Sequence, residues 1–188
     1  MPAAKQITER EFRRALAICS TRRHSTRDAT ILQLSYLAGL RACEIAALRV
    51  GDVYATDHSV NRSITLSAEQ TKGGRARVFY VNQALARVLD HYRNSIPNTA
   101  ATAPLFQTQQ ATAFSANTIS QLFLHIYAAA GLDGCSSHSG RRSFITRLAE
   151  QGVAVHLLAA LAGHRSIQTT QRYITVNDAL LARAVELA

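Results

Sequence analysis

The chain has 188 residues and a formal net charge of +9, from 21 lysines and arginines against 12 aspartates and glutamates. This length suits one domain with a core of its own, and the charge favours a polyanion, most simply nucleic acid, over other partners. The three cysteines are far apart and form neither a CxxC pair nor a disulfide framework. The first twelve residues lack the apolar core of a signal peptide, and no apolar run approaches the roughly 20 residues of a membrane helix. We therefore expect a soluble, cytoplasmic protein.

Helical patterns fill the first part of the chain. A T-x-x-E capping box opens a helix over about Thr8–Cys19. Apolar residues at helical spacing predict a second helix over about Arg27–Ala38, which Gly39 ends. A short helix is expected over about Ala42–Leu48, with Arg41 at its start.

The middle of the chain changes character. Two short β-rich segments, Ser63–Leu66 and Ala76–Val81, flank the turn signal Gly73-Gly74. Gly51-Asp52 also has the composition of a turn. This segment predicts a small antiparallel sheet of two or three strands.

Helical spacing then returns and continues to the end of the chain. The expected helices are about Gln83–Ser95, a helix capped by Ser115 and ended by Gly131, and about His138–Gln151, Val155–Ala162, Ser166–Tyr173 and Asn177–Leu187. The predicted fold class is therefore mainly α with a small antiparallel β-sheet (α+β). No segment separates from the rest, so residues 1–188 are expected to form one domain.

His138 and Arg141 are three residues apart at the start of a helix that Ser136 or Ser137 is expected to cap. Residues at this spacing share a helix face. The first turn of a helix attracts anions, and the fork of arginine donors matches phosphate oxygens. The pair therefore suits a phosphate, although a solvated polar helix start explains it equally well.

Four other polar residues have ordinary explanations when each is taken alone. Arg41 fits a surface charge, Lys72 a solvated turn, Gly163-His164 a helix cap and Tyr173 a half-buried aromatic. Their order along the chain, together with that of His138 and Arg141, carries more information than any one of them.

With these residues in this order, the sequence resembles the phage-integrase family of tyrosine recombinases. The resemblance covers about residues 8–180, and the matching stretches are Ala38–Leu48, Thr71–Gly74, His138–Thr146 and Leu161–Tyr173.

The resemblance implies the fold of a tyrosine recombinase catalytic domain and a set of catalytic roles. Tyr173 would attack a DNA phosphorus and form a 3′-phosphotyrosine link, which splits one displacement into two. Arg41 and Arg141 would hold the non-bridging oxygens. The remaining implied roles are a proton transfer by His138, protonation of the leaving 5′-oxygen by Lys72, a hydrogen bond from His164, and orientation of an arginine by Glu44.

The resemblance also implies the partners. The substrate would be double-stranded DNA, cut and rejoined with no metal, no ATP and no other cofactor. The chain would act as a homo-oligomer, a tetramer on DNA. The apolar face of residues 178–187 would either dock on a neighbouring protomer, as the family suggests, or pack on its own domain.

Three features depart from the family pattern. Gly140 stands where leucine is common, and Thr175 stands where a histidine is common. The chain also begins almost directly at the catalytic domain, without the N-terminal helical domain that clamps the other face of DNA. We expect that the chain is either a fragment or similar to the short single-domain members of the family.

Three other functions compete with this interpretation. Val155–Tyr173 has the pattern of a helix-turn-helix, so the chain could be a non-catalytic DNA-binding module. A type IB topoisomerase has a similar catalytic set. A structural or interaction protein with a basic surface would show no nicking of DNA.

Overall fold

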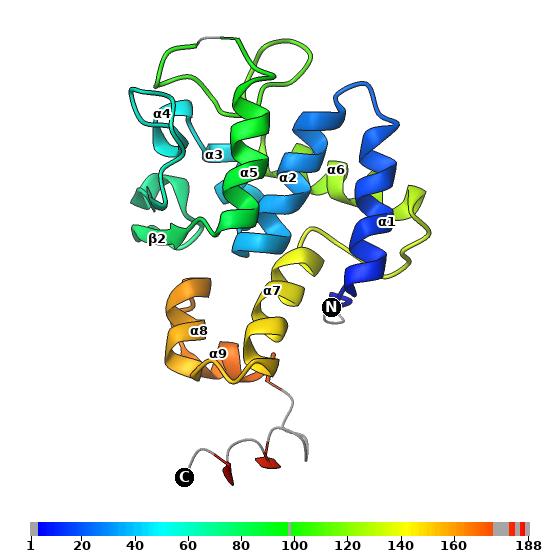
Figure 1. The fold of residues 1–188 in the computed structure, drawn as a ribbon, viewed down its shortest axis with the longest axis vertical. Helices are drawn as coiled ribbons and strands as arrows, with labels where there is room; N and C mark the ends of the chain where they lie inside the picture. The colour runs from blue at the N-terminus through cyan, green and yellow to red at the C-terminus, as the bar shows by residue number, and fades with distance from the viewer. Residues whose placement is uncertain (1–3, 98, 175–180, 183–184, 187–188) are drawn as a thin grey trace.

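The computed structural model describes residues 4–97, 99–174, 181–182 and 185–186. Helices form most of this part of the chain, and two short strands form its sheet (Figure 1). The elements in chain order are α1 (Glu9–Ser20), α2 (Ser25–Ala38), α3 (Ala42–Ala47), α4 (Val50–Val53), β1 (Ser63–Leu66), the 3₁₀ helix η1 (Ala68–Gln70), β2 (Arg77–Tyr80), α5 (Gln83–Arg93), α6 (Ala116–Ala129), α7 (Ser139–Glu150), α8 (Val155–Ala162) and α9 (Ile167–Gln171).

The predicted fold class is confirmed: the chain is mainly helical with a small antiparallel sheet. β1 and β2 pair in antiparallel register, with Ser63 opposite Tyr80 and Leu66 opposite Arg77. In the described residues this sheet has two strands. The prediction of a turn at Gly51-Asp52 is wrong, because these residues belong to α4, whose first turn is capped by a hydrogen bond from the Arg49 N–H to Asp52 (2.8 Å).

Local capping chemistry sets several helix ends where the sequence places them. In α1, the Glu11 N–H donates to Thr8 Oγ1 (3.2 Å) and the Thr8 N–H donates to Glu11 Oε2 (2.8 Å), which is the predicted capping box. Ser115 caps α6 by accepting from the Thr118 N–H (3.1 Å). α2 begins at Ser25, two residues before the predicted start.

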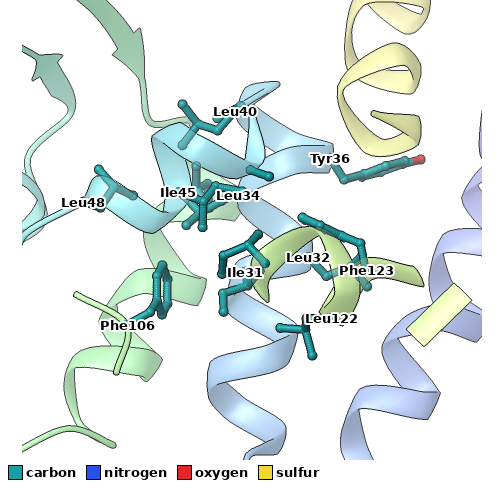
Figure 2. Packing of buried hydrophobic residues seen from close by; sticks show 14 of the residues in the cluster. Ile31, Leu32, Leu34, Tyr36, Leu40, Ile45, Leu48, Phe106, Leu122 and Phe123 are labelled. Carbon is teal, nitrogen blue, oxygen red and sulfur yellow. The ribbon is translucent and has the colours of Figure 1, made fainter. Parts of the chain in front are cut away.

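The core surrounds α2, which is covered on most sides by other helices. Its residues Ile31, Leu32 and Leu34 are fully buried, and they pack among side chains from α3 and α6 such as Ile45 and Phe123 (Figure 2). A helix buried all round carries apolar residues on most of its faces. α2 therefore lies at the centre of the core, and Arg41 follows just after its C-terminal end.

α7, α8 and α9 extend from this body as a unit, with α7 leading away from it (Figure 1). The α2–α7 contact is close at Gly140, where an added Cβ would lie 2.7 Å from Ser35 Oγ and 3.2 Å from the Ser35 backbone. Arg147 strengthens the contact by donating to Tyr36 O (2.7 Å) and lying over the Tyr36 ring. The leucine that is common in the family at position 140 has no room here.

Part of the predicted C-terminal helix, Asn177–Leu187, falls on residues outside those described. Among the described helices, none has the length and apolar composition needed to cross a membrane.

Gly140→Ala is expected to destabilise the protein by about 1–3 kcal/mol, because the added methyl overpacks the α2–α7 contact. Urea unfolding followed by circular dichroism measures the change. Ser35→Ala should recover part of the loss, since it removes the nearest atom, and Ser35 Oγ is a buried hydroxyl with no hydrogen-bond partner in the described structure. A Gly140→Ala protein as stable as the wild type would show that the two helices are not in close contact.

Candidate active site

Arg41 occupies the N-cap position of α3, directly after the end of α2. α2 ends because Gly39 adopts a left-handed conformation (φ 66°) close against Phe144, where a Cβ would lie 2.5 Å from the ring. The N–H and the guanidinium of Arg41 both donate to Glu44, each at 2.8 Å. Because Glu44 is fully buried, these bonds fix the Arg41 side chain at the end of α2.

Glu44 also binds a second arginine, from the sheet. Arg77 of β2 donates to both carboxylate oxygens of Glu44, at 3.0 and 2.7 Å. Burial raises the pKa of Glu44, but the hydrogen bonds and charge of Arg77, followed by those of Arg41, outweigh burial and hold this pKa below its ordinary 4.5. Glu44 is therefore ionised at neutral pH and compensates part of the charge of two guanidiniums.

Arg141 is buried and joins the ends of two helices. Its Nη1 donates to Gly39 O (2.6 Å) after α2, and its Nη2 donates to Ala162 O at the end of α8. The last carbonyls of a helix lack intrahelical partners and carry partial negative charge, so a cation is stabilised there. Burial, and then the charge of Arg41, lowers the pKa of Arg141 from its ordinary 12.5. An arginine nevertheless keeps its charge at any working pH.

The end of α8 is bound by three arginines, which we call the arginine cluster: Arg41, Arg77 and Arg141. The carbonyls of residues 161, 162 and 163 accept in turn from Arg77 (3.0 Å), Arg141 and Arg41 (3.3 Å). Gly163 is needed for this approach, because it has φ 60° and an added Cβ would lie 2.6 Å from Arg77 Cδ. The cluster thus fixes α8 relative to α2, α3 and β2.

A cavity of about 530 Å³ opens beside the cluster, and Arg41, Lys72 and His164 are among its lining residues. Lys72 lies on an exposed turn between η1 and β2. His138 occupies the N-cap position of α7, and burial, followed by the charges of Arg141, Lys72 and Arg41, lowers its pKa below the ordinary 6.5. His138 is therefore close enough to Arg141, Lys72 and Arg41 for their charges to lower its pKa.

The predicted cap of this helix is wrong in detail. His138 itself occupies the N-cap position of α7, and its side chain makes no capping hydrogen bond. Ser136 Oγ instead accepts from the His138 N–H (3.3 Å), because the chain forms a tight turn before the helix. Ser137 lies within the same turn.

His164 lies just past the end of α8 and Tyr173 just past the end of α9, and the two side chains lie side by side. Their rings stack with centroids 5.8 Å apart and planes 22° apart. His164 Nδ1 forms a hydrogen bond with Thr170 Oγ1 (2.9 Å), which orients the imidazole. Burial, followed by the charges of Arg141, Arg41 and Arg77, lowers the pKa of His164 to about 4. His164 is therefore neutral at neutral pH.

Tyr173 follows α9 rather than lying within it, because α9 ends at Gln171. The predicted helix Ser166–Tyr173 is thus shorter at both ends. The half-buried Tyr173 ring lies under the Arg142 guanidinium, 5.7 Å from it, and the tyrosine acts electrostatically on Arg141. The nucleophile proposed from the sequence is therefore close to the arginine cluster.

The structure brings the six predicted site residues together around the end of α8. They come from α3, the η1–β2 turn, the start of α7 and the segment from the end of α8 to just past α9. Sequence reasoning missed Arg77, although its two-residue offset from the buried Phe79 placed it on the inner face of β2. It also missed Arg165, which donates to Gly73 O (2.7 Å) across the cavity and has no local pattern that marks it.

Within the described residues, no group of three or more histidine, cysteine, aspartate or glutamate side chains is arranged to hold a metal ion.

The site is thus a strongly cationic cavity on a small helical domain, and Tyr173 stacks on His164, one of the residues that line the cavity. The chain matches the model of the phage integrase family over residues 5–179, and it belongs to that family.

Individual relatives agree with this assignment. Tyrosine recombinase XerC of Pelobacter propionicus is 28% identical over 155 residues, which cover 82% of this chain and 49% of the relative. Tyrosine recombinase XerA of Pyrococcus horikoshii is 29% identical over 185 residues, which cover 98% of this chain and 61% of the relative. The chain therefore spans only about half to three fifths of the length of these curated relatives.

A solved structure shows the same fold. The structure of the Tn1549 transposon integrase (residues 82–397) in complex with circular intermediate DNA superposes with a TM-score of 0.77 and 18% identity. The match covers 100% of this chain and 68% of that one.

The low pKa of His164 makes stability depend on pH. His164 titrates near pH 4 when folded and near the ordinary 6.5 when unfolded, so between these values the unfolded chain binds more protons. The stability that neutral His164 contributes is fully present above pH 6.5 and is lost as pH falls toward 4.

We therefore expect the difference in unfolding free energy between wild type and His164→Gln to shrink on acidification, by about 1–3 kcal/mol. Urea titrations at several pH values between neutrality and pH 4 measure this difference, and all other titrating groups cancel in it. A difference that is constant with pH would contradict the buried, neutral imidazole.

Proposed function

We propose that the chain is the catalytic domain of a site-specific DNA recombinase or integrase, which cuts double-stranded DNA through Tyr173. One observation carries the proposal: three guanidiniums meet beside a cavity with one buried carboxylate, Glu44, which pairs with only two of them. Tyr173 stacks on His164, a residue that lines this cavity. Such a site has an excess of fixed positive charge and suits a phosphodiester. The names of the relatives, all tyrosine recombinases, and the DNA complex of the Tn1549 integrase support this assignment.

In the proposed reaction, Tyr173 Oη attacks the scissile phosphorus and forms a 3′-phosphotyrosine bond while the P–O5′ bond breaks. A phenol attacks well only after losing its proton, and His138 takes that proton, since its lowered pKa keeps it unprotonated at neutral pH. Lys72 gives a proton to the leaving 5′-oxygen. The 5′-hydroxyl of a second strand then reverses the steps, so religation consumes no nucleotide.

Arg41 and Arg141 stabilise the charge that develops on the non-bridging oxygens. A guanidinium has five N–H donors, and the hydrogen bonds to the ends of α2 and α8 occupy only two of those of Arg141. These donors are already oriented, so little reorganisation is required in the transition state. His164, neutral and oriented by Thr170, adds a hydrogen bond to the phosphate.

The proposed active form is a homo-oligomer, a tetramer on DNA, that uses residues 178–187 to dock one copy on the next. The described side chains of this segment include the exposed Leu181 and Val185, which agree with an apolar docking face. Truncation before residue 178 should then weaken assembly on DNA in gel-shift experiments, and unchanged assembly would contradict the docking role.

The helix-turn-helix alternative loses support from the geometry. Its second helix, which would lie in the major groove, corresponds to α9, and α9 has only 5 residues. The carbonyls at the end of its first helix, α8, are also occupied by the arginine cluster.

The central prediction concerns Tyr173→Phe. A library of nicked duplexes with random sequence should yield a covalent protein–DNA adduct with the wild type, because the nick releases a short strand and prevents religation. Sequencing the captured DNA identifies the preferred site. Tyr173→Phe should form no adduct and should bind that DNA within about twofold of the wild type, since it lacks only the attacking oxygen.

Tyr80→Phe is the matched control, because Tyr80 is an exposed tyrosine of β2 (61% exposed) outside the site, and it should form the adduct normally. An adduct that persists in Tyr173→Phe would refute the assigned nucleophile. Relaxation of a supercoiled plasmid that lacks the captured site would favour the topoisomerase alternative.

Binding to the captured DNA should depend strongly on salt. The logarithm of the affinity should fall linearly with the logarithm of the salt concentration, with a slope of about −0.9 for each phosphate neutralised. Arg41→Ala should reduce the slope by about one unit, whereas Arg87→Ala, a change on α5 away from the site, should leave it unchanged. Fluorescence anisotropy at several salt concentrations measures the slopes, and salt-independent binding would contradict a phosphate-based interface.

A further inference from the structure

The turn that carries Lys72 is held to the opposite wall of the cavity by Arg165. Nη2 of Arg165 donates to Gly73 O at 2.7 Å, and its Nε would lie 3.8 Å from a Cβ added at residue 73. The contact therefore joins the residue after Lys72 to the residue after His164. It links two segments that line the cavity and are far apart in the sequence.

The turn has an internal framework that does not fix its position in the molecule. Thr71 Oγ1 donates to Arg75 O (2.7 Å) and accepts from the Arg75 N–H (3.2 Å), and Gly74 has φ 63°. Among the hydrogen bonds between described residues, the bond from Arg165 is the one that ties residues 71–75 to a segment outside the β1–β2 connection. The turn can thus keep its own shape and still move relative to the site when this bond is absent.

The position of the Lys72 ammonium group is set by the backbone of the turn that carries it. In the described part of the chain, its ammonium forms no hydrogen bond or ion pair that would orient it. Arg41 and Arg141, in contrast, are each fixed by two hydrogen bonds. A long lysine side chain on an exposed turn with two glycines therefore needs its turn to be fixed from outside.

We propose that Arg165 is a positioning residue that holds the Lys72 turn against the end of α8, so that the Lys72 ammonium reaches the leaving 5′-oxygen. This inference rests on the proposed function, in which Lys72 is the proton donor. Arg165 acts through the backbone of Gly73 and touches no reacting atom. The expected loss from Arg165→Ala is about 3- to 10-fold in cleavage rate, the equivalent of one ordinary hydrogen bond.

The test compares two leaving groups on the captured DNA site, in nicked duplexes with saturating protein. One duplex has the natural 5′-oxygen at the scissile bond, and the other has sulfur in its place. A thiol has a pKa of about 8.5, so a thiolate leaves without a proton donor, unlike an alkoxide. Loss of a correctly placed Lys72 should therefore slow cleavage of the oxygen duplex and spare the sulfur duplex.

We expect Arg165→Ala to cleave the oxygen duplex about 3- to 10-fold more slowly than the wild type and the sulfur duplex at the wild-type rate. Lys72→Ala should show the same pattern with a larger loss on oxygen. Arg87→Ala, which removes an exposed arginine outside the site, should match the wild type on both duplexes. Arg165→Gln, a second variant, provides the same comparison should the alanine protein fold poorly by circular dichroism.

Three results would overturn the proposal: equal slowing on both duplexes, a change in DNA affinity with no change in rate at saturation, or no change at all. The first would make Arg165 a residue of phosphate stabilisation or general structure, and the second a DNA contact. Failure of the proposed function looks different, because the wild type itself would then form no adduct, or sulfur would not rescue Lys72→Ala.

Discussion

The site depends on the carbonyls of residues 161–163, at the C-terminal end of α8, and on the arginines that bind them. A helix end leaves these oxygens without partners, and here each receives a guanidinium from a different part of the chain: the end of α2, strand β2 and helix α7. One set of hydrogen bonds thus satisfies these carbonyls and brings the three arginines of the cluster together. Gly163 allows these hydrogen bonds to form, because a side chain at residue 163 would displace Arg77.

The same interactions leave the site with an excess of positive charge. Glu44 pairs with Arg41 and Arg77, whereas Arg141 forms no ion pair within the described residues and donates to carbonyls at two helix ends. Burial and this positive charge lower the pKa values of His138 and His164, so both imidazoles are neutral at neutral pH. In the proposed function, a phosphodiester would supply the missing negative charge, and the donors that meet it would already be fixed by the fold.

The sequence predicted what depends on local patterns. The capping box at Thr8, the stop at Gly39 and the antiparallel pair β1–β2 follow from neighbouring residues, and the structure has them. The six candidate site residues could be selected only by their order along the chain. The sequence analysis missed Arg165 because its partner is a carbonyl 92 residues away, and a carbonyl has no sequence signature. It missed Arg77 because the partners of this side chain, the Glu44 carboxylate and the carbonyl of residue 161, lie 33 and 84 residues away. Their pairing is a property of the packed helices rather than of any segment.

The close contact of α7 with α2 at Gly140 affects how the two parts of the site lie relative to each other. His138, Arg141, His164 and Tyr173 all lie on the unit formed by α7, α8 and α9, whereas Arg41 and Lys72 belong to the body around α2 (Figure 1). A small tilt of α7 at that contact would displace four of the six groups in concert. Substitutions buried between α2 and α7 would therefore change the relative positions of these groups without altering any of the six side chains, and under the proposed function they would change the rate of strand exchange.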